Sequence, residues 1–218
     1  MLRQVKGKNI VEISGDELKN LIAGFEKIVV DLGTGDGKFA YNYAKKNPNC
    51  FVIGIDAVSE LMEEISRKID KKPAKGGLEN IIYICSAVES LPDELSNIAD
   101  EIHINFPWGS LLNGVIKGNP EILSNIKKIA KNSESTFKCY TTYSRKYEET
   151  MINENNLPDL SMEYIQNELT EVYKKYGLII EEVNILTSEE KKNLQSSWVK
   201  KLLDKRQRDV YSFSGIIK

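Results

Sequence analysis

The feature that most constrains the fold is a short apolar run that ends in an acid and leads straight into a glycine-rich turn. The run Ile28 to Val30 is followed by Asp31. Glycines then stand at every second position: Gly33, Gly35 and Gly37. Such a run predicts a buried strand, and the glycines predict a sharp turn into a helix. Because glycine has no Cβ, the backbone of this turn can pass close to a bound ligand.

The spacing of these glycines indicates what kind of ligand the turn can hold. It is G-x-G-x-G and not the G-x-G-x-x-G that cradles a pyrophosphate, and an acid precedes it. A carboxylate at the end of a strand repels phosphate and attracts a ligand with cationic or hydroxyl groups. S-adenosylmethionine carries an amino group, a sulfonium and a ribose diol, so it fits such a turn. An ordinary strand-to-helix loop without a ligand is the alternative interpretation.

A second apolar run, Phe51 to Ile55, also ends in an acid, Asp56. In a doubly wound sheet, an acid at this place hydrogen-bonds the ribose hydroxyls of a nucleotide cofactor. The segment Asp-Leu-Gly-Thr-Gly-Asp-Gly (31–37), together with Asp56, resembles the cofactor site of class I (Rossmann-like) S-adenosylmethionine-dependent methyltransferases. This resemblance indicates the superfamily and leaves the substrate open.

The composition fits one globular domain. The chain has 218 residues, 41% of them hydrophobic, and we expect residues 1–218 to form a single domain. No run of 18 apolar residues and no apolar N-terminal stretch is present, so we expect neither a membrane span nor a signal peptide. Cys50, Cys85 and Cys139 form no metal motif and predict reduced, buried thiols in a cytoplasmic protein without a metal. The formal net charge is −2, so a nucleic acid would have to meet a local basic patch.

Strands alternate with helical stretches along most of the chain, which predicts an α/β fold with a parallel sheet. We expect a Rossmann-like sheet of seven mostly parallel strands with helices on both faces, and a β-hairpin in residues 1–13 ahead of it. The predicted strands are 28–31, 51–56, 81–84, 101–106, 136–143, 178–186 and 210–217. The predicted helices are 14–23, 37–46, 58–72, 110–117, 120–132 and one of about 17 residues from Ser188. Residues 144–177 are polar and acid-rich and predict a helical insertion.

Two loops beyond predicted strands carry candidate site residues. Glu89, a few residues after the third strand, is suitably placed to contact the adenine amino group of a cofactor; a solvated loop glutamate is the alternative. Trp108 follows the fourth strand, at the end of the sheet where substrates of such folds bind. A tryptophan between proline and glycine is poorly placed for the core and well placed as a rigid plate for an aromatic substrate, although core packing stays open. The other tryptophan, Trp198, shares helical spacing with Leu194 and Leu202, so an ordinary core position stays open for it as well.

Two basic clusters stand out in this slightly acidic chain. They lie in residues 67–75 and 200–208, each with five cations and a single acid. We expect four lysines of the first cluster to share one helical face: Lys68, Lys71, Lys72 and Lys75. Lysines near the end of a helix also complement its dipole, and a charge run is usually just solvated. Two such clusters beside a methyltransferase crevice nevertheless favour contacts with phosphates.

Further segments narrow the resemblance. They are Glu-Ser-Leu-Pro (89–92), Phe-Pro-Trp-Gly-Ser-Leu-Leu (106–112), Thr-Thr-Tyr-Ser (141–144) and Ser-Ser-Trp-Val-Lys-Lys-Leu (196–202). With the glycine turn, they resemble the aminoglycoside-resistance methyltransferases of the Kam/Npm type, from the N-terminal hairpin to the last strand. The resemblance implies an enzyme that uses S-adenosyl-L-methionine to methylate N1 of a decoding-site adenine, adenine 1408 of 16S rRNA, within the assembled 30S subunit. We expect it to act as a monomer.

The resemblance also implies roles for single residues. Trp108 and Trp198 would hold the flipped adenine between their rings, and Ser196 would help to position it. Residues at the strand ends would surround the cofactor: Asp31, Gly33, Thr34, Gly35, Asp56, Ala87, Glu89, Asn105 and Ser110. The linker 145–149 and two basic sets would contact the rRNA: Arg67, Lys68, Lys71, Lys72, Lys75, Lys201, Arg206 and Arg208. Some arginines of the family appear here as lysine, as at Lys201, which offers a point charge and not a fork.

The expected chemistry needs few catalytic groups. Adenine N1 has a free lone pair and no proton to lose, so its methylation requires no general base. The only histidine, His103, lies inside a predicted strand, and we expect it to be structural. Proximity and orientation would supply most of the catalysis. Flipping the base costs a few kcal/mol, and stacking on aromatic plates returns roughly 1–3 kcal/mol per base.

Three other functions fit parts of the sequence. The Pro-Trp pair after the fourth strand also resembles tRNA guanine-N7 methyltransferases. A nicotinamide-dependent oxidoreductase could use the same fold, although the glycine spacing and the acid before it argue against one. A non-catalytic RNA-binding module would bind the cofactor without transferring its methyl group to any RNA.

Overall fold

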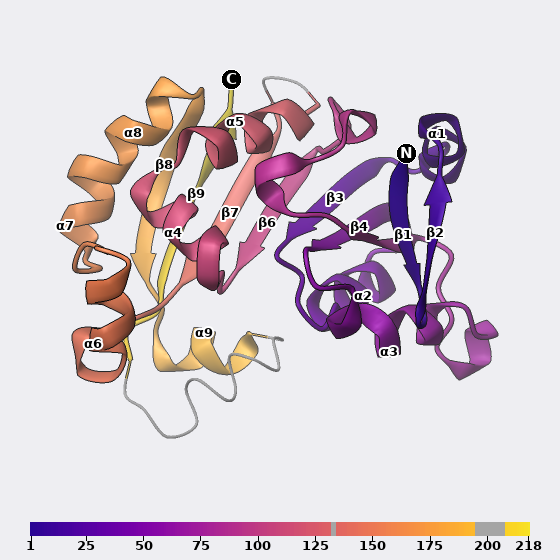
Figure 1. Cartoon of the computed structure of the whole chain (residues 1–218), viewed down its shortest axis with the longest axis horizontal. Coiled ribbons are helices and arrows are strands. Elements are labelled where there is room, and N and C mark those ends of the chain that lie inside the picture. Colours follow the sequence, from indigo (N-terminus) through magenta and orange to yellow (C-terminus); the bar gives the residue numbers. More distant parts are fainter. Residues whose placement is uncertain (132–133, 195–207) are drawn as a thin grey trace.

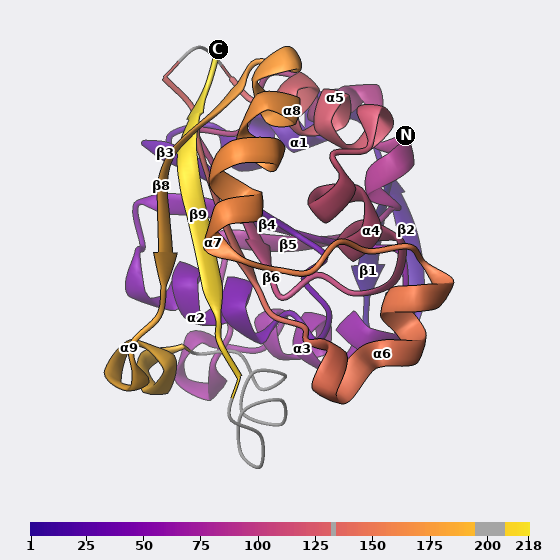
Figure 2. The ribbon, with the colours of Figure 1, turned by 90° about the vertical axis from the view of Figure 1, so that its left-hand side faces the viewer.

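The computed structural model describes residues 1–131, 134–194 and 208–218. Its strands form one mixed sheet in the order β2-β1-β5-β4-β3-β6-β7-β9-β8 (Figures 1 and 2). The strands are β1 (Leu2–Lys6), β2 (Asn9–Ile13), β3 (Lys27–Leu32), β4 (Cys50–Asp56), β5 (Ile81–Cys85), β6 (Glu101–Asn105), β7 (Thr136–Thr141), β8 (Leu178–Ile185) and β9 (Tyr211–Ile217). Strands β3 to β7 are mutually parallel, and β9 lies antiparallel between β7 and β8. The predicted sheet of seven mostly parallel strands is therefore confirmed.

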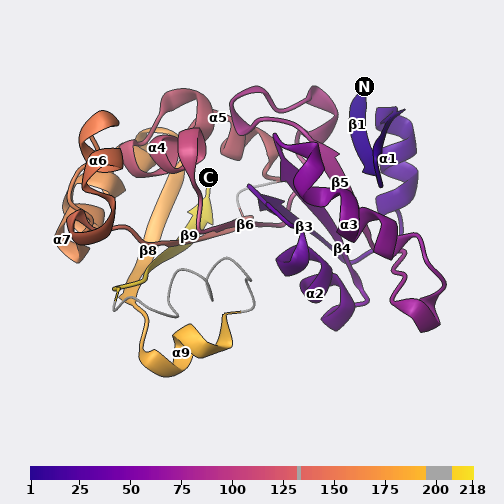
Figure 3. The ribbon, with the colours of Figure 1, turned by 60° about the horizontal axis from the view of Figure 1, so that its bottom comes forward.

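Helices cover both faces of this sheet, as the sequence predicts. They are α1 (Gly15–Ile22), α2 (Lys38–Lys46), α3 (Ser59–Ile69), α4 (Gly109–Lys117), α5 (Pro120–Ile129), α6 (Arg145–Glu154), α7 (Met162–Tyr164), α8 (Thr170–Lys175) and α9 (Ser188–Asn193). Short helical turns η1 (Pro73–Lys75), η2 (Val88–Ser90) and η3 (Asp93–Leu95) and a π-helical stretch η4 (Ile165–Leu169) complete them. Apolar residues of α2 and α3 pack on one face, and those of α1, α4, α5 and α8 on the other (Figure 3). No helix in the described part of the chain is long and apolar enough to cross a membrane.

The N-terminal hairpin is present as predicted, but it is part of the sheet and does not lie ahead of it. Strand β1 pairs antiparallel with β5, with Gln4 opposite Ile84. The turn between β1 and β2 has Gly7 at a φ of 60°, a conformation that suits glycine. The Gly7 amide donates a hydrogen bond of 2.9 Å to Ser66 Oγ on α3. The hairpin is thus fixed both to the sheet edge and to a helix.

Three predicted helices end earlier than expected. Helix α3 ends at Ile69, because Pro73 keeps Lys72 out of the helical region, at φ −57° and ψ 146°. The expectation that four lysines share one helical face is wrong for Lys71, Lys72 and Lys75, which lie beyond the helix. Helix α5 ends at Ile129, since Ala130 is extended and forms a bridge with Ala99.

Helix α9 begins at Ser188, as the last predicted helix does, and ends at Asn193 because Leu194 is extended; the rest of the predicted helix, from residue 195 on, lies outside the described residues. Its start has a reciprocal cap that the sequence reasoning missed. Thr187 accepts a hydrogen bond from the Glu190 amide, and the Glu190 carboxylate accepts one from the Thr187 amide. The insertion 144–177 is helical as predicted, through α6, α7, η4 and α8. Each of the three cysteines is a free, buried thiol, also as predicted.

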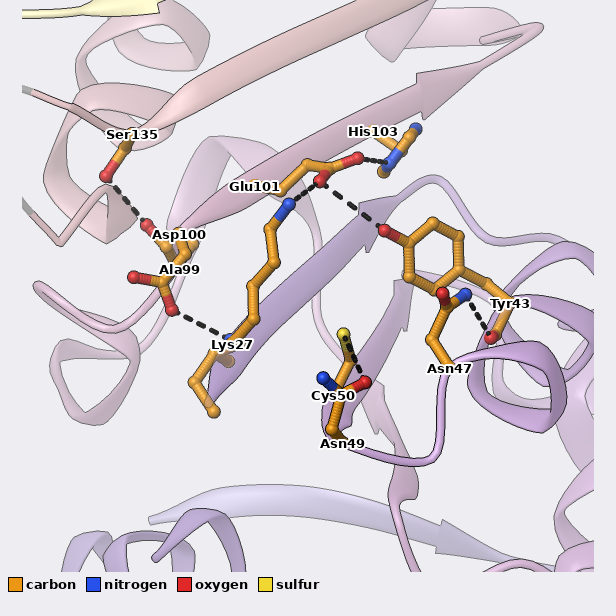
Figure 4. A network of polar contacts seen from close by, with 11 residues as sticks. Lys27, Tyr43, Asn47, Asn49, Cys50, Ala99, Asp100, Glu101, His103 and Ser135 are labelled. Atoms are coloured by element: carbon orange, nitrogen blue, oxygen red, sulfur yellow. Dashed lines mark hydrogen bonds and ion pairs between the residues drawn. The ribbon is translucent and has the colours of Figure 1, made fainter. Parts of the chain in front are cut away.

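A polar network lies at the amino ends of β3 and β6 (Figure 4). The Glu101 carboxylate accepts hydrogen bonds from Lys27 Nζ and contacts His103 Nε2. Burial alone would raise the pKa of Glu101, but the bonds with His103 and Lys27 outweigh it and lower this pKa to about 2. The His103 ring is buried against the rings of Phe39 and Tyr43, at centroid distances of 5.0 and 5.5 Å. This surrounding is that of the structural histidine we expect.

Candidate cofactor and nucleobase site

The glycine turn is fastened to the neighbouring strand by its own backbone. The amides of Gly33 and Thr34 both donate to the Ile55 carbonyl at 2.9 Å, and the Gly35 amide donates to Asp56 Oδ2 at 2.8 Å. Gly33 and Gly35 have φ values of 71° and 55°, in the left-handed region that favours glycine. A Cβ built on Gly35 would meet nothing within 4 Å. The turn is thus rigid, and open on its Gly35 side.

Asp31 lies at the centre of this site, at the carboxyl end of β3. Its side chain is buried, with 1% of the residue exposed. One oxygen accepts a hydrogen bond of 2.5 Å from Thr34 Oγ1, and the other accepts one of 3.0 Å from Asn105 Nδ2 on β6. Both donors are neutral, and burial raises the pKa of Asp31 to about 6 despite them. A cationic ligand group would favour the charged carboxylate, so the site suits an ammonium or sulfonium.

These groups fit S-adenosylmethionine. Asp31 and Asp56 bring two carboxylates to adjacent strand ends, for an ammonium and a ribose diol. Asp56 also accepts a hydrogen bond of 3.0 Å from the Val58 amide, which fixes the carboxylate. Of the expected cofactor residues, the structure brings together Asp31, Gly33, Thr34, Gly35, Asp56 and Asn105 through these bonds.

The loop that contains Ala87 and Glu89 is held by Asn125, a contact that the sequence did not predict. Asn125 Nδ2, on α5, donates to the carbonyls of Val88 and Glu89 at 2.9 and 2.8 Å. An amide on the inner side of an otherwise amphipathic helix is the only signal for it in the sequence. The contact sets the position of the Glu89 backbone relative to the sheet.

Trp108 lies outside the core, so the core alternative is wrong for this residue. It is 47% exposed and precedes α4 in an extended conformation. Phe106, two residues earlier, has a φ of 53°, uncommon for a residue with a side chain. Its amide donates to the Tyr140 carbonyl at 2.8 Å and its ring stacks on the Tyr140 ring, which holds this strained turn in place. The turn directs the chain so that Trp108 lies at the surface.

Trp108, Glu89 and Ser110 line the same cavity, of about 920 Å³. The three residues come from two loops and the first turn of α4. The structure therefore brings the expected adenine contact and the expected base plate to the two sides of one opening. Trp198 and Ser196 lie outside the described residues.

The expected RNA contacts differ in their surroundings. Arg67, Lys71, Lys72 and Lys75 are exposed, whereas Lys68 is half-buried with its Nζ 4.0 Å above the Tyr41 ring. Lys201 and Arg206 lie outside the described residues.

Arg208 is not an exposed cation. Its side chain is 1% exposed and forms an ion pair with Glu148 of α6, which is also buried. A buried carboxylate needs such a partner, and the two residues are too far apart in sequence for their pairing to be predicted. In this structure Arg208 holds α6 against the start of β9 and does not extend the basic cluster.

Comparisons with known proteins agree with this geometry. The family described as NpmA, 16S rRNA (adenine(1408)-N(1))-methyltransferase, matches residues 3–217. An Escherichia coli 16S rRNA (adenine(1408)-N(1))-methyltransferase is 46% identical over 215 residues, which cover 97% of this chain and 96% of the relative. One from Streptoalloteichus tenebrarius is 34% identical over 217 residues, 99% of each chain. The crystal structure of the 16S rRNA methyltransferase KamB superposes with a TM-score of 0.90 over 100% of both chains at 34% identity.

A further solved structure was determined with a cosubstrate. It is a mutant of the 16S rRNA (adenine(1408)-N(1))-methyltransferase from Catenulisporales acidiphilia with SAM, with a TM-score of 0.90 and 29% identity, covering 100% of this chain and 97% of that one. The match runs through the glycine turn, the tryptophan loop and the last strand alike. The chain belongs to the NpmA family of 16S rRNA (adenine(1408)-N(1))-methyltransferases.

Proposed function

We propose that this chain methylates N1 of adenine 1408 in 16S rRNA, with S-adenosyl-L-methionine as donor, and thereby confers aminoglycoside resistance. The observation that carries the proposal is the family match over residues 3–217. Relatives with that activity align with this chain over almost their whole length. The substrate would be the assembled 30S subunit, and the enzyme would act as a cytoplasmic monomer. All described strands join one sheet, which supports a single catalytic domain over residues 1–218.

The acids at the strand ends would hold the cofactor. When bound, S-adenosylmethionine supplies an electrophilic methyl group. Asp31 would hold its ammonium, Asp56 its ribose hydroxyls and Glu89 its adenine amino group, with Ala87 and Ser110 beside the adenine. Asn105 keeps the Asp31 carboxylate oriented through its hydrogen bond of 3.0 Å. The open Gly35 side of the turn leaves room for the ligand backbone.

Trp108 would act on the substrate base as a plate. Its exposed indole lies beside the cavity that Glu89 also lines, so a flipped adenine stacked on it would lie next to the cofactor. Stacking offsets part of the cost of flipping, by roughly 1–3 kcal/mol per base. Methylation makes the base cationic, and an indole face attracts a cation. Trp198 would cover the other face of the base, and Ser196 would help to position it.

For methyl transfer to adenine N1, the chain needs to orient the base toward the methyl group and does not need to supply a proton acceptor. Adenine N1 offers a lone pair, and His103 is buried in the middle of β6, where its ring contacts Glu101. We assign rRNA contacts to Arg67, Lys68, Lys71, Lys72, Lys75, Lys201 and Arg206. Arg208 would have to leave Glu148 to reach a phosphate.

Expression in a susceptible bacterium tests the proposal. We expect resistance to kanamycin and apramycin, and a primer-extension stop at adenine 1408. Purified 30S subunits and tRNA, offered separately with labelled cofactor, distinguish the nearest rival. Label in tRNA and none in 30S subunits would replace this proposal by a tRNA methyltransferase.

A further inference from the structure

The cavity beside Trp108 and Glu89 continues far beyond them, as a groove between α4 and α6. Its lining follows α4 from Gly109 to Gly118, which at 1.5 Å per residue is a length of about 14 Å. The opposite wall is the end of α6, from Met151 to Asn156, and the far end is the start of α5. We name this cavity the α4–α6 groove.

The groove is larger than the part of the cofactor that would enter it. Its volume of about 920 Å³ lies at the upper end of the range of about 300–1,000 Å³ for pockets that take a whole drug-sized ligand. The proposed function places the adenine of the cofactor at one end, between Glu89 and Ser110, and the substrate base beside it on Trp108. The remainder of the groove has no assigned occupant.

The lining of the groove favours an uncharged ligand, because it combines glycines and apolar side chains with amides. Asn113 Nδ2 donates to the Gly109 carbonyl and to Asn155 Oδ1, at 3.1 and 3.0 Å, whereas Asn113 Oδ1 is buried with no hydrogen-bond partner among the described residues. Because this oxygen is buried, the Asn113 amide fixes the wall of the groove and is not itself offered to a ligand. Lys117 donates to the Asn155 carbonyl and so bridges the two walls.

The charges of the groove argue against an RNA backbone as its occupant. Its lining contains two carboxylates, Glu89 and Glu154, and one cation, Lys117. The start of α5 offers no anion site either, because Asn119 Oδ1 already accepts from the amides of Glu121 and Ile122. Phosphates need cations, so a net negative groove repels them.

We propose that the α4–α6 groove binds substituents carried on the exocyclic N6 of the cofactor's adenine. The ligand class is that of N6-substituted adenosyl compounds. A singly substituted N6 keeps one N–H for the Glu89 carboxylate, and its substituent then extends along α4 toward Asn113 and Lys117. This inference rests on the proposed function, in that Glu89 holds the adenine amino group.

Calorimetry on the full chain tests this with S-adenosylhomocysteine and its N6-benzyl derivative. We expect the native chain to bind the two within about threefold of each other in Kd. Glu154→Trp, an exposed position of α6 that lines the groove, should weaken the N6-benzyl compound at least about tenfold and leave S-adenosylhomocysteine unchanged. The matched control is Asn153→Trp, also exposed on α6 but lining a different cavity, which should affect neither ligand.

Two results would overturn the inference and leave the proposed function standing. The first is S-adenosylhomocysteine that binds the native chain while the N6-benzyl compound binds about a hundredfold more weakly. The second is equal affinity of the N6-benzyl compound for the native chain and Glu154→Trp, with both folded by circular dichroism. Failure of S-adenosylhomocysteine itself to bind would overturn both the groove assignment and the proposed cofactor.

Discussion

Two acids on adjacent strands, Asp31 of β3 and Glu101 of β6, are held in opposite ways. Glu101, at the amino end, is bonded to Lys27 and His103, and its pKa is lowered to about 2. Asp31, at the carboxyl end, has only the neutral donors Thr34 and Asn105, and burial raises its pKa to about 6. Glu101 has hydrogen-bonded cationic partners, whereas Asp31 has a weaker interaction with His103 that does not offset its burial, so a cationic ligand would stabilise its charge. One end of the sheet is therefore built for stability and the other for a ligand.

The largest effect is expected from replacing Trp108, which should impair the use of the substrate while leaving both Asp31 and Glu101 in place. We expect Trp108→Ala to lower methylation of 30S subunits at least about a hundredfold, since the base loses a plate worth roughly 1–3 kcal/mol and its placement. Cofactor affinity and thermal stability should stay close to native. Labelled-methyl transfer, calorimetry and thermal unfolding check the three quantities. Turnover at the native rate would contradict the assigned role.

The substitution Asp31→Asn removes the carboxylate that only neutral donors, Thr34 and Asn105, hydrogen-bond. We expect cofactor affinity to fall about 10- to 100-fold, because a hydrogen bond to a charged group contributes about 1.5–3 kcal/mol. The melting temperature at pH 7 should not fall, since the substitution also removes a buried carboxylate whose hydrogen-bond donors, Thr34 and Asn105, are both neutral. Calorimetry and thermal unfolding of the same preparation decide this. A large loss of stability together with native cofactor affinity would show that Asp31 stabilises the fold and does not bind the cofactor.

Glu101→Gln should have the converse effect. It leaves Lys27 and His103 without their charged partner, and we expect the free energy of unfolding at pH 7 to fall by about 1–3 kcal/mol. Cofactor affinity should be unchanged. Because the folded pKa of Glu101 is lowered, its contribution is present above its ordinary pKa of 4.5 and is lost as the pH falls toward about 2. Denaturant unfolding of both chains should therefore show curves that converge in acid.

The smallest expected effect is the pH dependence of cofactor binding. Asp31 has a folded pKa of about 6, so below that pH the carboxyl is protonated and must release its proton to bind a cation. Affinity should be about tenfold lower at pH 5 than at pH 7, and Asp31→Asn should abolish this difference. Titration calorimetry at a series of pH values measures it. If the cofactor affinity of Asp31→Asn falls with pH as steeply as that of the native chain, a group other than Asp31 takes up the proton.

The sequence predicted the strands and the glycine turn of the site well, because the signals for them are local. Apolar runs that end in Asp31 and Asp56 and the glycines between them lie within a single βαβ unit, and the residues that flank Trp108 favoured a surface position for it without excluding the core. Contacts between distant segments left no such signal. The bonds of Asn105 to Asp31, Asn125 to the Glu89 loop and Arg208 to Glu148 join residues far apart in the chain.

The end of α3 shows a different limit. The periodic pattern of the sequence predicted a helix that included its lysines. In the structure, Pro73 restricts the backbone of Lys72 to a non-helical conformation. Local conformational rules overrode the pattern there. The same holds for Phe106, whose left-handed backbone is set by its contacts with Tyr140 and by no residue type in the segment.

The position of β9 between β7 and β8 has a consequence for synthesis of the protein. In the described part of the chain β8 pairs only with β9, so β8 cannot join the sheet until β9 has left the ribosome's exit tunnel. The α6–α8 segment would meanwhile be held by its contacts with α4, such as the hydrogen bonds of Tyr164 and Tyr173 to the Ile116 and Val115 carbonyls. Until β9 emerges, β7 would also present an unpaired edge, which favours pairing with other chains.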